Sequence, residues 1–277
     1  MKHVEKISVL MAVHNGIDPS HLHEAFESLH RQTLQPSQIV LVEDGPLNRE
    51  LKAIIAKWRW VWRRRLTLVR NRTNRGLTFS LNRGIGQVRY PLIARMDSDD
   101  VAHPERFERQ ARFLARHRDI AVVGGAIVEF GQITPHNTRH YPLSHNEALR
   151  SIHRASPLAH PAVMMRREIF HNGLRYDERY RTSQDIALWF DAICAGYRIA
   201  NLREAVLYYR IDNDTFRRRA ASKAWGELKI YCNGIRRLHG IFSWRYIFPI
   251  GRFFARLRPS GIIRRLYRSD LRRAIVE

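Results

Sequence analysis

The sequence has few of the features that mark disulfide-stapled domains, zinc modules or membrane spans. Only two of its 277 residues are cysteine. Cys194 and Cys232 stand in no CxxC or zinc-ligand spacing, which argues against a structural disulfide and indicates a reducing compartment. No run approaches the ~20 apolar residues that a membrane-spanning helix needs, and the first residues lack the apolar stretch and cleavage site of a signal peptide. We therefore expect a cytoplasmic protein, with any membrane contact peripheral and on the inner face of the cell membrane.

Acidic residues are also scarce relative to basic ones. Forty-eight Lys and Arg against 26 Asp and Glu give a net charge of +22, which predicts an anionic partner such as nucleic acid, phospholipid or a phosphorylated substrate. From Arg217 onward the sequence has sixteen basic residues against three acidic ones, interleaved with aromatic and aliphatic residues. This basic, helical tail suits a segment lying on an anionic membrane surface, or else a helical lid whose arginines are solvated.

The third absence is a GxGxxG motif after the first apolar run, which argues against a dinucleotide-dependent dehydrogenase. The first part of the chain instead alternates apolar strands with helical periodicity. The expected strands are residues 7–13, 38–42, 66–69 and 91–96, and the expected helices are residues 20–32, 48–58, 77–88 and 104–117. This alternation predicts an α/β fold with a mostly parallel sheet covered by helices on both faces.

Further along, the pattern is less regular. We expect strands at 120–130 and 163–165, helices at 166–171 and 183–195, a strand pair at 198–211, and an irregular, histidine-rich segment at 132–160. The expected division is a catalytic domain at 1–215 and the basic tail at 216–277.

Polar residues follow the carboxyl ends of the first four expected strands. They are Asn15, then Glu43 and Asp44, then Asn74 and Arg75, and finally Asp97 and Asp99. In open parallel sheets, ligands bind beyond the carboxyl ends of the strands. The four clusters are therefore expected to converge on one crevice.

The acidic segment RMDSDD at residues 95–100 carries the sharpest chemical signal. If it stays extended, Asp97 and Asp99 face the same side about 7 Å apart and Asp100 points away. Oxygen ligands of this kind hold Mn²⁺ or Mg²⁺ against substrate phosphates. The alternative is that Asp99 and Asp100 only cap the next helix. The position of the pair at the end of a buried strand favours the metal and nucleotide interpretation.

Taken in order, these motifs resemble those of the family 2 glycosyltransferases of the GT-A fold, over residues 7–211. The matching segments are VHNG at 13–16, VEDG at 42–45, NRGL at 74–77 with LNRG at 81–84, ARMDSDD at 94–100 and PERF at 104–107. The VEDGPL segment at 42–47 resembles the branch that builds bacterial exopolysaccharide and lipopolysaccharide, including amylovoran-type transferases.

The resemblance implies a Rossmann-like sheet and a role for each cluster. Asn15, Asp44 and Arg75 would line the nucleoside pocket, together with Glu43 and Asn74 as further nucleotide-sugar contacts. Asp97 would contact the ribose or the metal ion, and Asp99 would bind Mn²⁺ or Mg²⁺. The segment SQDIALW at 183–189 resembles the family's catalytic helix and places Asp185 as the general base. By itself, Asp185 could equally be a charge favoured at a helix N-terminus.

The sequence departs from the family's pattern at two positions on the acceptor side. Gln184 stands where glutamate is usual, and Asp212 stands after Tyr209, Arg210 and Ile211 where histidine is frequent. His160 lies where relatives place residues near the acceptor, although a lone histidine is more often structural.

The expected function is metal-dependent, inverting transfer of a sugar from a nucleotide-sugar, preferably a UDP-sugar, to a saccharide or lipid-linked saccharide in bacterial surface polysaccharide synthesis. A metal-dependent nucleotidyltransferase or phosphohydrolase could use the same carboxylates, but would not need Asp185. The charge also fits a nucleic-acid-binding protein. Clustered acids at strand ends would repel its phosphates, so no nucleic-acid partner is expected.

Overall fold

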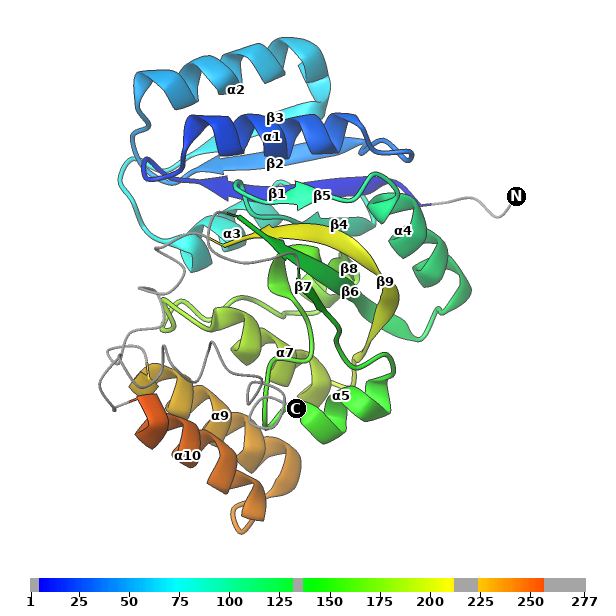
Figure 1. Ribbon diagram of the computed structural model, residues 1–277, viewed down its shortest axis with the longest axis vertical. Coiled ribbons are helices and arrows are strands. Elements are labelled where there is room, and N and C mark those ends of the chain that lie inside the picture. Colours follow the sequence, from blue (N-terminus) through cyan, green and yellow to red (C-terminus); the bar gives the residue numbers. More distant parts are fainter. Residues whose placement is uncertain (1–4, 132–136, 212–223, 257–277) are drawn as a thin grey trace.

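The computed structural model describes residues 5–131, 137–211 and 224–256. Within them, a sheet of nine strands runs in the order β3-β2-β1-β4-β8-β6-β9-β5, with β7 paired to β6, and helices lie on both of its faces (Figure 1). The strands are β1 Ile7–Val13, β2 Gln38–Glu43, β3 Leu66–Arg70, β4 Leu92–Arg95, β5 Val101–Ala102, β6 Ile120–Phe130, β7 Asn137–Arg139, β8 Met164–Arg166 and β9 Arg198–Arg210.

The helices alternate with these strands through most of the chain. They are α1 Pro19–His30, α2 Arg49–Trp62, α3 Leu77–Ile85, α4 Arg106–Arg116, α5 His145–Ser151, α6 Glu168–His171, α7 Gln184–Cys194, α9 Ala224–His239 and α10 Ile247–Arg256. Three 3₁₀ turns, η1 Arg63–Arg65, η2 His160–Ala162 and η4 Trp244–Tyr246, complete the described elements.

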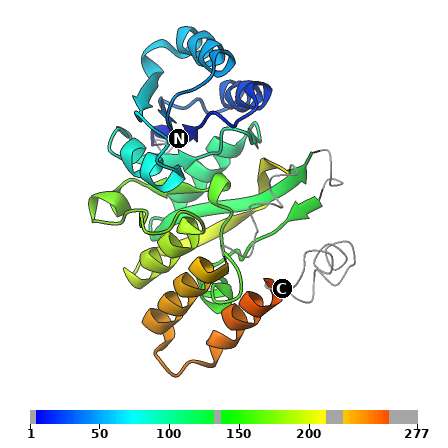
Figure 2. The ribbon, with the colours of Figure 1, turned by 90° about the vertical axis from the view of Figure 1, so that its left-hand side faces the viewer.

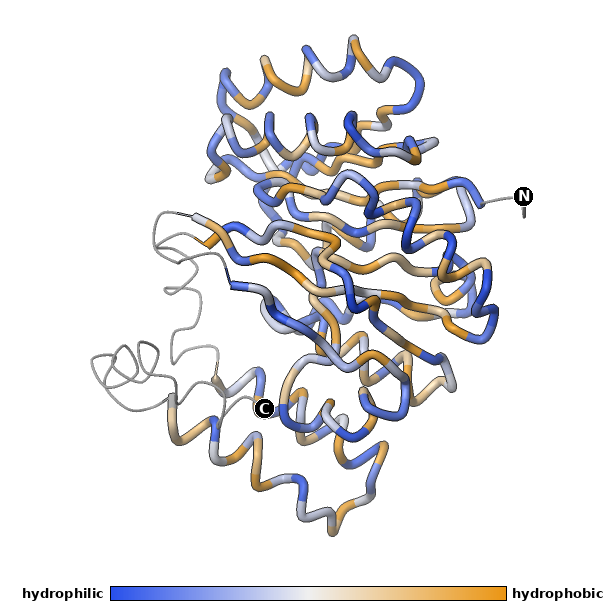
Figure 3. Tube along the Cα trace, turned by 45° about the vertical axis from the view of Figure 1, so that its right-hand side comes forward, coloured by the Kyte–Doolittle hydropathy of each residue, from blue (hydrophilic) through white to orange (hydrophobic). Residues whose placement is uncertain are grey.

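The first half of the sheet confirms the predicted parallel α/β unit. Strands β3, β2, β1 and β4 all pair in parallel. Val9 and Met11 belong to the core that α1, α2 and α4 cover, whereas Leu10 and Val40 belong to the core that α3 covers. Because β1, β2 and β4 are buried on both faces, their sequences are mostly hydrophobic, and the central strands are accordingly mostly orange in Figure 3.

The second half of the sheet is mixed and differs from the prediction. β8 is antiparallel to both β4 and β6, and β6 then pairs in parallel with β9. The expected strand pair at 198–211 is wrong: residues 198–210 form one long strand. Its register against β6 shifts near Gly125 and Ala126, and such irregularities let one strand bend where two had been expected.

The segment expected to be irregular contains a strand and a helix. β7 occupies residues 137–139, and α5 begins at a capping box in which Ser144 accepts the backbone N–H of Glu147. The predicted pattern missed α5 because its seven residues contribute only one buried side chain, Ala148, to the core.

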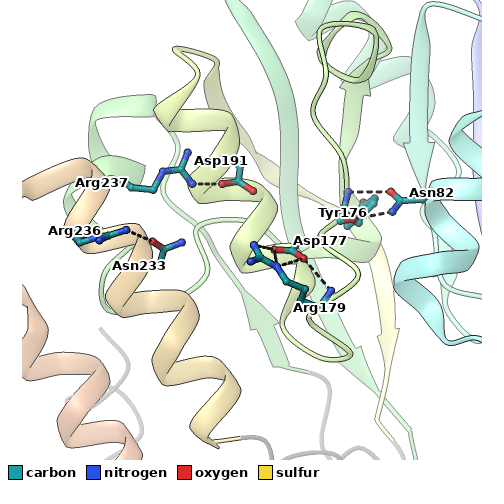
Figure 4. Close-up of polar contacts among 8 residues, drawn as sticks. All are labelled: Asn82, Tyr176, Asp177, Arg179, Asp191, Asn233, Arg236 and Arg237. Carbon is teal, nitrogen blue, oxygen red and sulfur yellow. Dashed lines mark hydrogen bonds and ion pairs between the residues drawn. The ribbon is translucent and has the colours of Figure 1, made fainter.

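The described part of the basic tail packs against the preceding domain. α9 lies on α7, and α10 lies on α9 (Figures 1 and 2). A Cβ atom at Gly234 would lie 2.3 Å from the Phe190 ring, so glycine permits this close approach. The Tyr231 ring meets Phe190 edge-on at 5.8 Å, and Arg237 forms an ion pair with Asp191 (Figure 4). None of the helices in the described ranges is long and apolar enough to cross a membrane.

Candidate active site

The carboxyl ends of β1, β2, β3 and β4 lie side by side at one end of the sheet. Val13 at the end of β1 pairs with Glu43 at the end of β2, and Glu43 pairs with Arg70 at the end of β3. On the other side of β1, the backbone N–H of Met96, just beyond β4, donates to the Leu10 carbonyl at 3.1 Å. This register brings the loops that carry the polar clusters to the same end of the sheet.

Residues 97–100, which we call the acidic turn, follow β4 at this end of the sheet. The chain turns at Ser98 and Asp99 instead of staying extended. Ligand oxygens of Asp97, Asp99 and Asp100 consequently all lie within 4.8 Å of one another. The expectation that Asp100 points away is wrong, because side-chain alternation ends where the strand ends.

The last residue of β9 holds the acidic turn in place. The backbone N–H of Arg210 donates to Asp100 Oδ1 at 2.9 Å, and its Nε donates to the Asp99 carbonyl at 2.8 Å. Within the described residues, the buried Oδ2 atom of Asp100 has no hydrogen-bond partner. Burial, reinforced by the charges of Asp99 and Asp97, raises the pKa of Asp100 well above its usual value. A carboxylate oxygen in this position is suited to a cation.

A buried guanidinium balances part of this negative charge. Arg95 is 1% exposed and forms an ion pair with Asp97. Arg106, also buried, donates from Nη2 to the Arg95 carbonyl at 2.6 Å and from Nε to Gln110 at 3.2 Å. Arg95 was not among the predicted site residues. Its signal was an arginine at the end of an otherwise wholly apolar strand, where a charge must have a partner.

Asp44 organises the loop at residues 74–76, which we call the donor loop. Its Oδ1 accepts the backbone N–H of Arg75 at 2.8 Å, and its Oδ2 accepts that of Gly76 at 2.9 Å. Oδ1 also accepts the side chain of Asn71 at 2.8 Å. A Cβ atom at Gly45 (φ +91°) would lie 2.7 Å from the Asn74 nitrogen. Asp44 therefore shapes the donor loop, a role that its predicted nucleoside contact did not include.

The other predicted donor residues lie at the ends of β1 to β3 or in the loops that follow these strands. Asn74 donates to the Asp44 carbonyl at 3.3 Å, and Glu43 pairs with Arg70 at 3.0 Å. Asn15 is exposed and accepts the backbone N–H of Asn48 at 2.7 Å. The Arg75 guanidinium lies 4.1 Å from the centre of the Phe79 ring. A pocket of about 110 Å³ opens here, lined by Arg75, Gly76, Leu77, Thr78, Phe79, Glu178 and Arg181.

Asp185 lies in the first turn of α7, on the side of the site formed by the second half of the chain. Ser183, two residues earlier, adopts a left-handed backbone conformation (φ 59°, ψ 22°). This conformation costs free energy in a non-glycine residue, and such strained residues are concentrated at functional sites. Asp185 is half-buried, and Gln184 is buried. Burial raises the pKa of Asp185, whereas the N–H groups of the first turn and the charge of Arg95 lower it.

His160 is buried and faces Tyr176. Its Nε2 lies 2.7 Å from the Tyr176 hydroxyl, and its ring centre lies 6.1 Å from that of Trp189 on α7. Burial and the charge of Arg95 lower the pKa of His160 well below its usual value, so the ring is neutral near pH 7. Tyr176, 1% exposed, is a residue that the motifs did not reveal. Asp212 lies outside the described residues.

Known proteins share both the sequence pattern and this architecture. Residues 8–174 match glycosyl transferase family 2. The chain is 30% identical to the amylovoran biosynthesis glycosyltransferase AmsE of Erwinia amylovora, covering 95% of this chain and 98% of that protein. It is also 30% identical to an Escherichia coli UDP-Gal:alpha-D-GlcNAc-diphosphoundecaprenol beta-1,3-galactosyltransferase, covering 97% of each.

Among solved structures, the mannosyltransferase PcManGT from Pyrobaculum calidifontis, in complex with GDP-Man and Mn²⁺, superposes with a TM-score of 0.66 at 12% identity. The match covers 91% of this chain and 70% of that one and shows the GT-A fold. From the motifs, the fold and these relatives together, the chain belongs to the family 2 glycosyltransferases, in the branch that makes bacterial polysaccharides.

Proposed function

We propose that this glycosyltransferase is metal-dependent and inverting, and that it moves a hexose from a UDP-sugar to a saccharide or lipid-linked saccharide. The observation that carries the proposal is the acidic turn, in which ligand oxygens of three carboxylates lie within 4.8 Å of one another. The activity named for the Escherichia coli relative, a galactosyltransferase that uses UDP-Gal, supports the choice of donor and acceptor.

The acidic turn suits a hard divalent cation such as Mn²⁺ or Mg²⁺. Three clustered carboxylates, one with a buried oxygen that lacks a partner among the described residues, need positive charge beyond that of Arg95. Asp99 and Asp97 would hold the ion, as the motif predicts, and Asp100 adds a third oxygen ligand. When bound, the ion would neutralise charge on the departing nucleoside diphosphate.

The chain's own residues supply the rest of the donor site. Asp44 fixes the backbone from which Arg75 extends, so the guanidinium is available to a base or a diphosphate. Asn15, Glu43 and Asn74 complete this proposed nucleotide-sugar pocket at the adjacent strand ends.

Asp185 is the proposed general base. Its carboxylate takes the proton of the acceptor hydroxyl as that oxygen bonds to the anomeric carbon and the bond to the nucleoside diphosphate breaks. One displacement of this kind inverts the anomeric configuration. The raised pKa of Asp185 suits a base working near neutral pH. Gln184 and Asp212 are proposed to act on the acceptor side, and His160 to support that side through Tyr176.

Three measurements test the catalytic proposal. The first is a thermal-shift panel of UDP, GDP, dTDP and CMP with and without Mn²⁺, in which we expect metal-dependent stabilisation by UDP. Stabilisation by none of the four nucleotides would defeat the proposal. The second compares Asp185→Asn with Asp191→Asn on the same helix, where only the first should abolish transfer. A β-linked product from an α-linked donor, identified by NMR, is the expected sign of inversion.

We further propose that the tail brings the enzyme to an anionic membrane surface, where a lipid-linked acceptor would lie. Exposed apolar side chains gather between α9 and α10, including Phe242 at 99% and Trp244 at 61% exposure. Arg245 lies beside them, with its guanidinium 5.3 Å from the Trp244 ring centre. Aromatic anchors among arginines favour a lipid interface.

Flotation with phosphatidylglycerol vesicles tests this contact. The full chain should float, and a Phe242→Ser and Trp244→Ser double variant should float less. The control is Trp60→Ser, since Trp60 is also exposed, at 76%, but lies on α2, far along the chain. Equal flotation of wild type and double variant would contradict the membrane proposal.

A further inference from the structure

Helix α3 connects the donor loop to the segment that precedes Asp185. The helix begins directly after Gly76, whose N–H is held by Asp44. One and a half turns further on, it carries Asn82, from the LNRG motif that the proposed function leaves without a role. The other end of the connection is the irregular segment at residues 174–182, which we call the base loop because it leads to Ser183 and Asp185.

Asn82 binds the base loop through three hydrogen bonds. Its Oδ1 accepts the backbone N–H of Tyr176 at 3.0 Å, and its Nδ2 donates to the Tyr176 carbonyl at 2.8 Å (Figure 4). Nδ2 also donates to Glu178 at 3.1 Å. A fourth bond comes from Thr78, one turn earlier on α3, whose hydroxyl donates to the Tyr180 carbonyl at 2.8 Å. The base loop is thus fixed to the same rigid helix that begins at the donor loop.

Tyr176 shows why this attachment matters for the site. Its hydroxyl holds His160, and its ring lies between the rings of His160 and Phe170. Burial raises the pKa of Tyr176; Arg95 lowers it, and the charges of Asp185 and Asp97 raise it further. Tyr176 is therefore within electrostatic reach of both a proposed donor carboxylate and the proposed base.

We propose that Asn82 is a positioning residue for sugar transfer, which fixes Tyr176 and the base loop so that Asp185 is held in register with the donor loop. This inference rests on the proposed role of Asp185. The residue type fits the task, because a carboxamide both donates and accepts. An aspartate side chain could accept the Tyr176 N–H, but its carboxylate would repel the Tyr176 carbonyl oxygen and the Glu178 carboxylate. Alanine would leave both buried backbone groups without the partner described here.

The test separates positioning from simple stabilisation. Asn82→Ala is compared with Asn172→Ala, which removes another asparagine side-chain bond, 2.9 Å to the Tyr197 hydroxyl, outside the site. We measure kcat and KM for release of the nucleotide that stabilises the wild type, and the Kd for that nucleotide with Mn²⁺. Small displacements of reacting groups cost about 10–100-fold in rate. Asn82→Ala should lose kcat on this scale with an unchanged nucleotide Kd, and Asn172→Ala should keep both.

Three results would overturn the inference. The first is an equal kcat in Asn82→Ala and Asn172→Ala, and the second is a fall in kcat matched by an equal loss of nucleotide affinity. If Asn82→Ala does not fold, Thr78→Val replaces it, because this change removes one bond to the base loop and keeps the side-chain volume. The third result that would overturn the inference is an unchanged kcat in Thr78→Val.

Asp185→Asn keeps the two proposals apart. Full activity in that variant removes the proposed base, whereas its inactivity beside a normal Asn82→Ala removes only the role of Asn82.

Discussion

The contact between the tail and the rest of the chain is predicted to weaken in mild acid, through His153. This histidine is 2% exposed, and neither ring nitrogen has a hydrogen-bond partner within the described residues. Its ring packs against Phe248 at 5.0 Å and Trp244 at 5.9 Å, both from the tail. Burial, with the charges of Arg154, Arg245 and His239, lowers the pKa of His153 to about 4.

The size and sign of the effect follow from this pKa. An unfolded histidine has a pKa of about 6.5, so between pH 6.5 and about 4 the unfolded chain binds more protons than the folded one. Stability therefore falls as pH falls through this window. Going from pH 7 to pH 5, protonation of the unfolded His153 alone removes about 2 kcal/mol from the free energy of unfolding.

Urea unfolding at pH 7 and pH 5 measures this loss in wild type and in His153→Phe. Phenylalanine suits the aromatic surroundings and cannot titrate, so the variant should lose about 2 kcal/mol less than wild type on acidification. The control is His171→Phe, at an exposed histidine on α6, which measures the effect of replacing a histidine by phenylalanine away from the tail. If His153→Phe and wild type lose the same stability between the two pH values, the reasoning from buried, unpaired nitrogens is refuted.

Four further predictions concern single positions. Gly234→Leu should destabilise the chain by about 1–3 kcal/mol in urea unfolding, since the added side chain meets the Phe190 ring. Gly226→Ala on the same helix should instead stabilise by about 0.5–1 kcal/mol, since among the described residues its Cβ meets no atom within 4 Å beyond the backbone of its own helix. Asp44→Asn loses a charged acceptor for the donor loop, and calorimetry should show UDP binding weakened by about tenfold or more. Ser183→Gly should raise the free energy of unfolding by roughly 1 kcal/mol, because glycine adopts the left-handed conformation without strain.

The parallel half of the fold was predictable because its signals are local. Apolar strands and helical periodicity alternate from residue 7 to residue 117, and the polar residues after each strand then had to share one edge. The loop at residues 74–76 illustrates the limit of this reasoning. Its place was predicted, but not that Asp44, thirty residues earlier, accepts its backbone N–H groups.

The parts that were not predicted depend on contacts between distant segments. Asp100 lies in the acidic cluster where the backbone N–H of Arg210 on β9 donates to its side chain. Hydrophobic periodicity does not predict a hydrogen bond between such distant residues. Arg95 and Tyr176 are both buried, and nearby charged side chains shift their pKa values. Contacts of this kind are not visible in the sequence. The single strand β9 also escaped prediction, since its bend comes from pairing with β6 and not from its own sequence.

The bond between Arg210 and Asp100 has a consequence for how the enzyme is made. It joins residues 110 positions apart, and β9 also pairs with β6 some eighty residues upstream. Contacts of such separation form late and slow the folding of a domain. During synthesis, the donor loop can assemble with the first strands, but the acidic turn gains its support only after residue 210 has left the ribosome. The supports of the donor loop are therefore synthesised well before the support of the acidic turn.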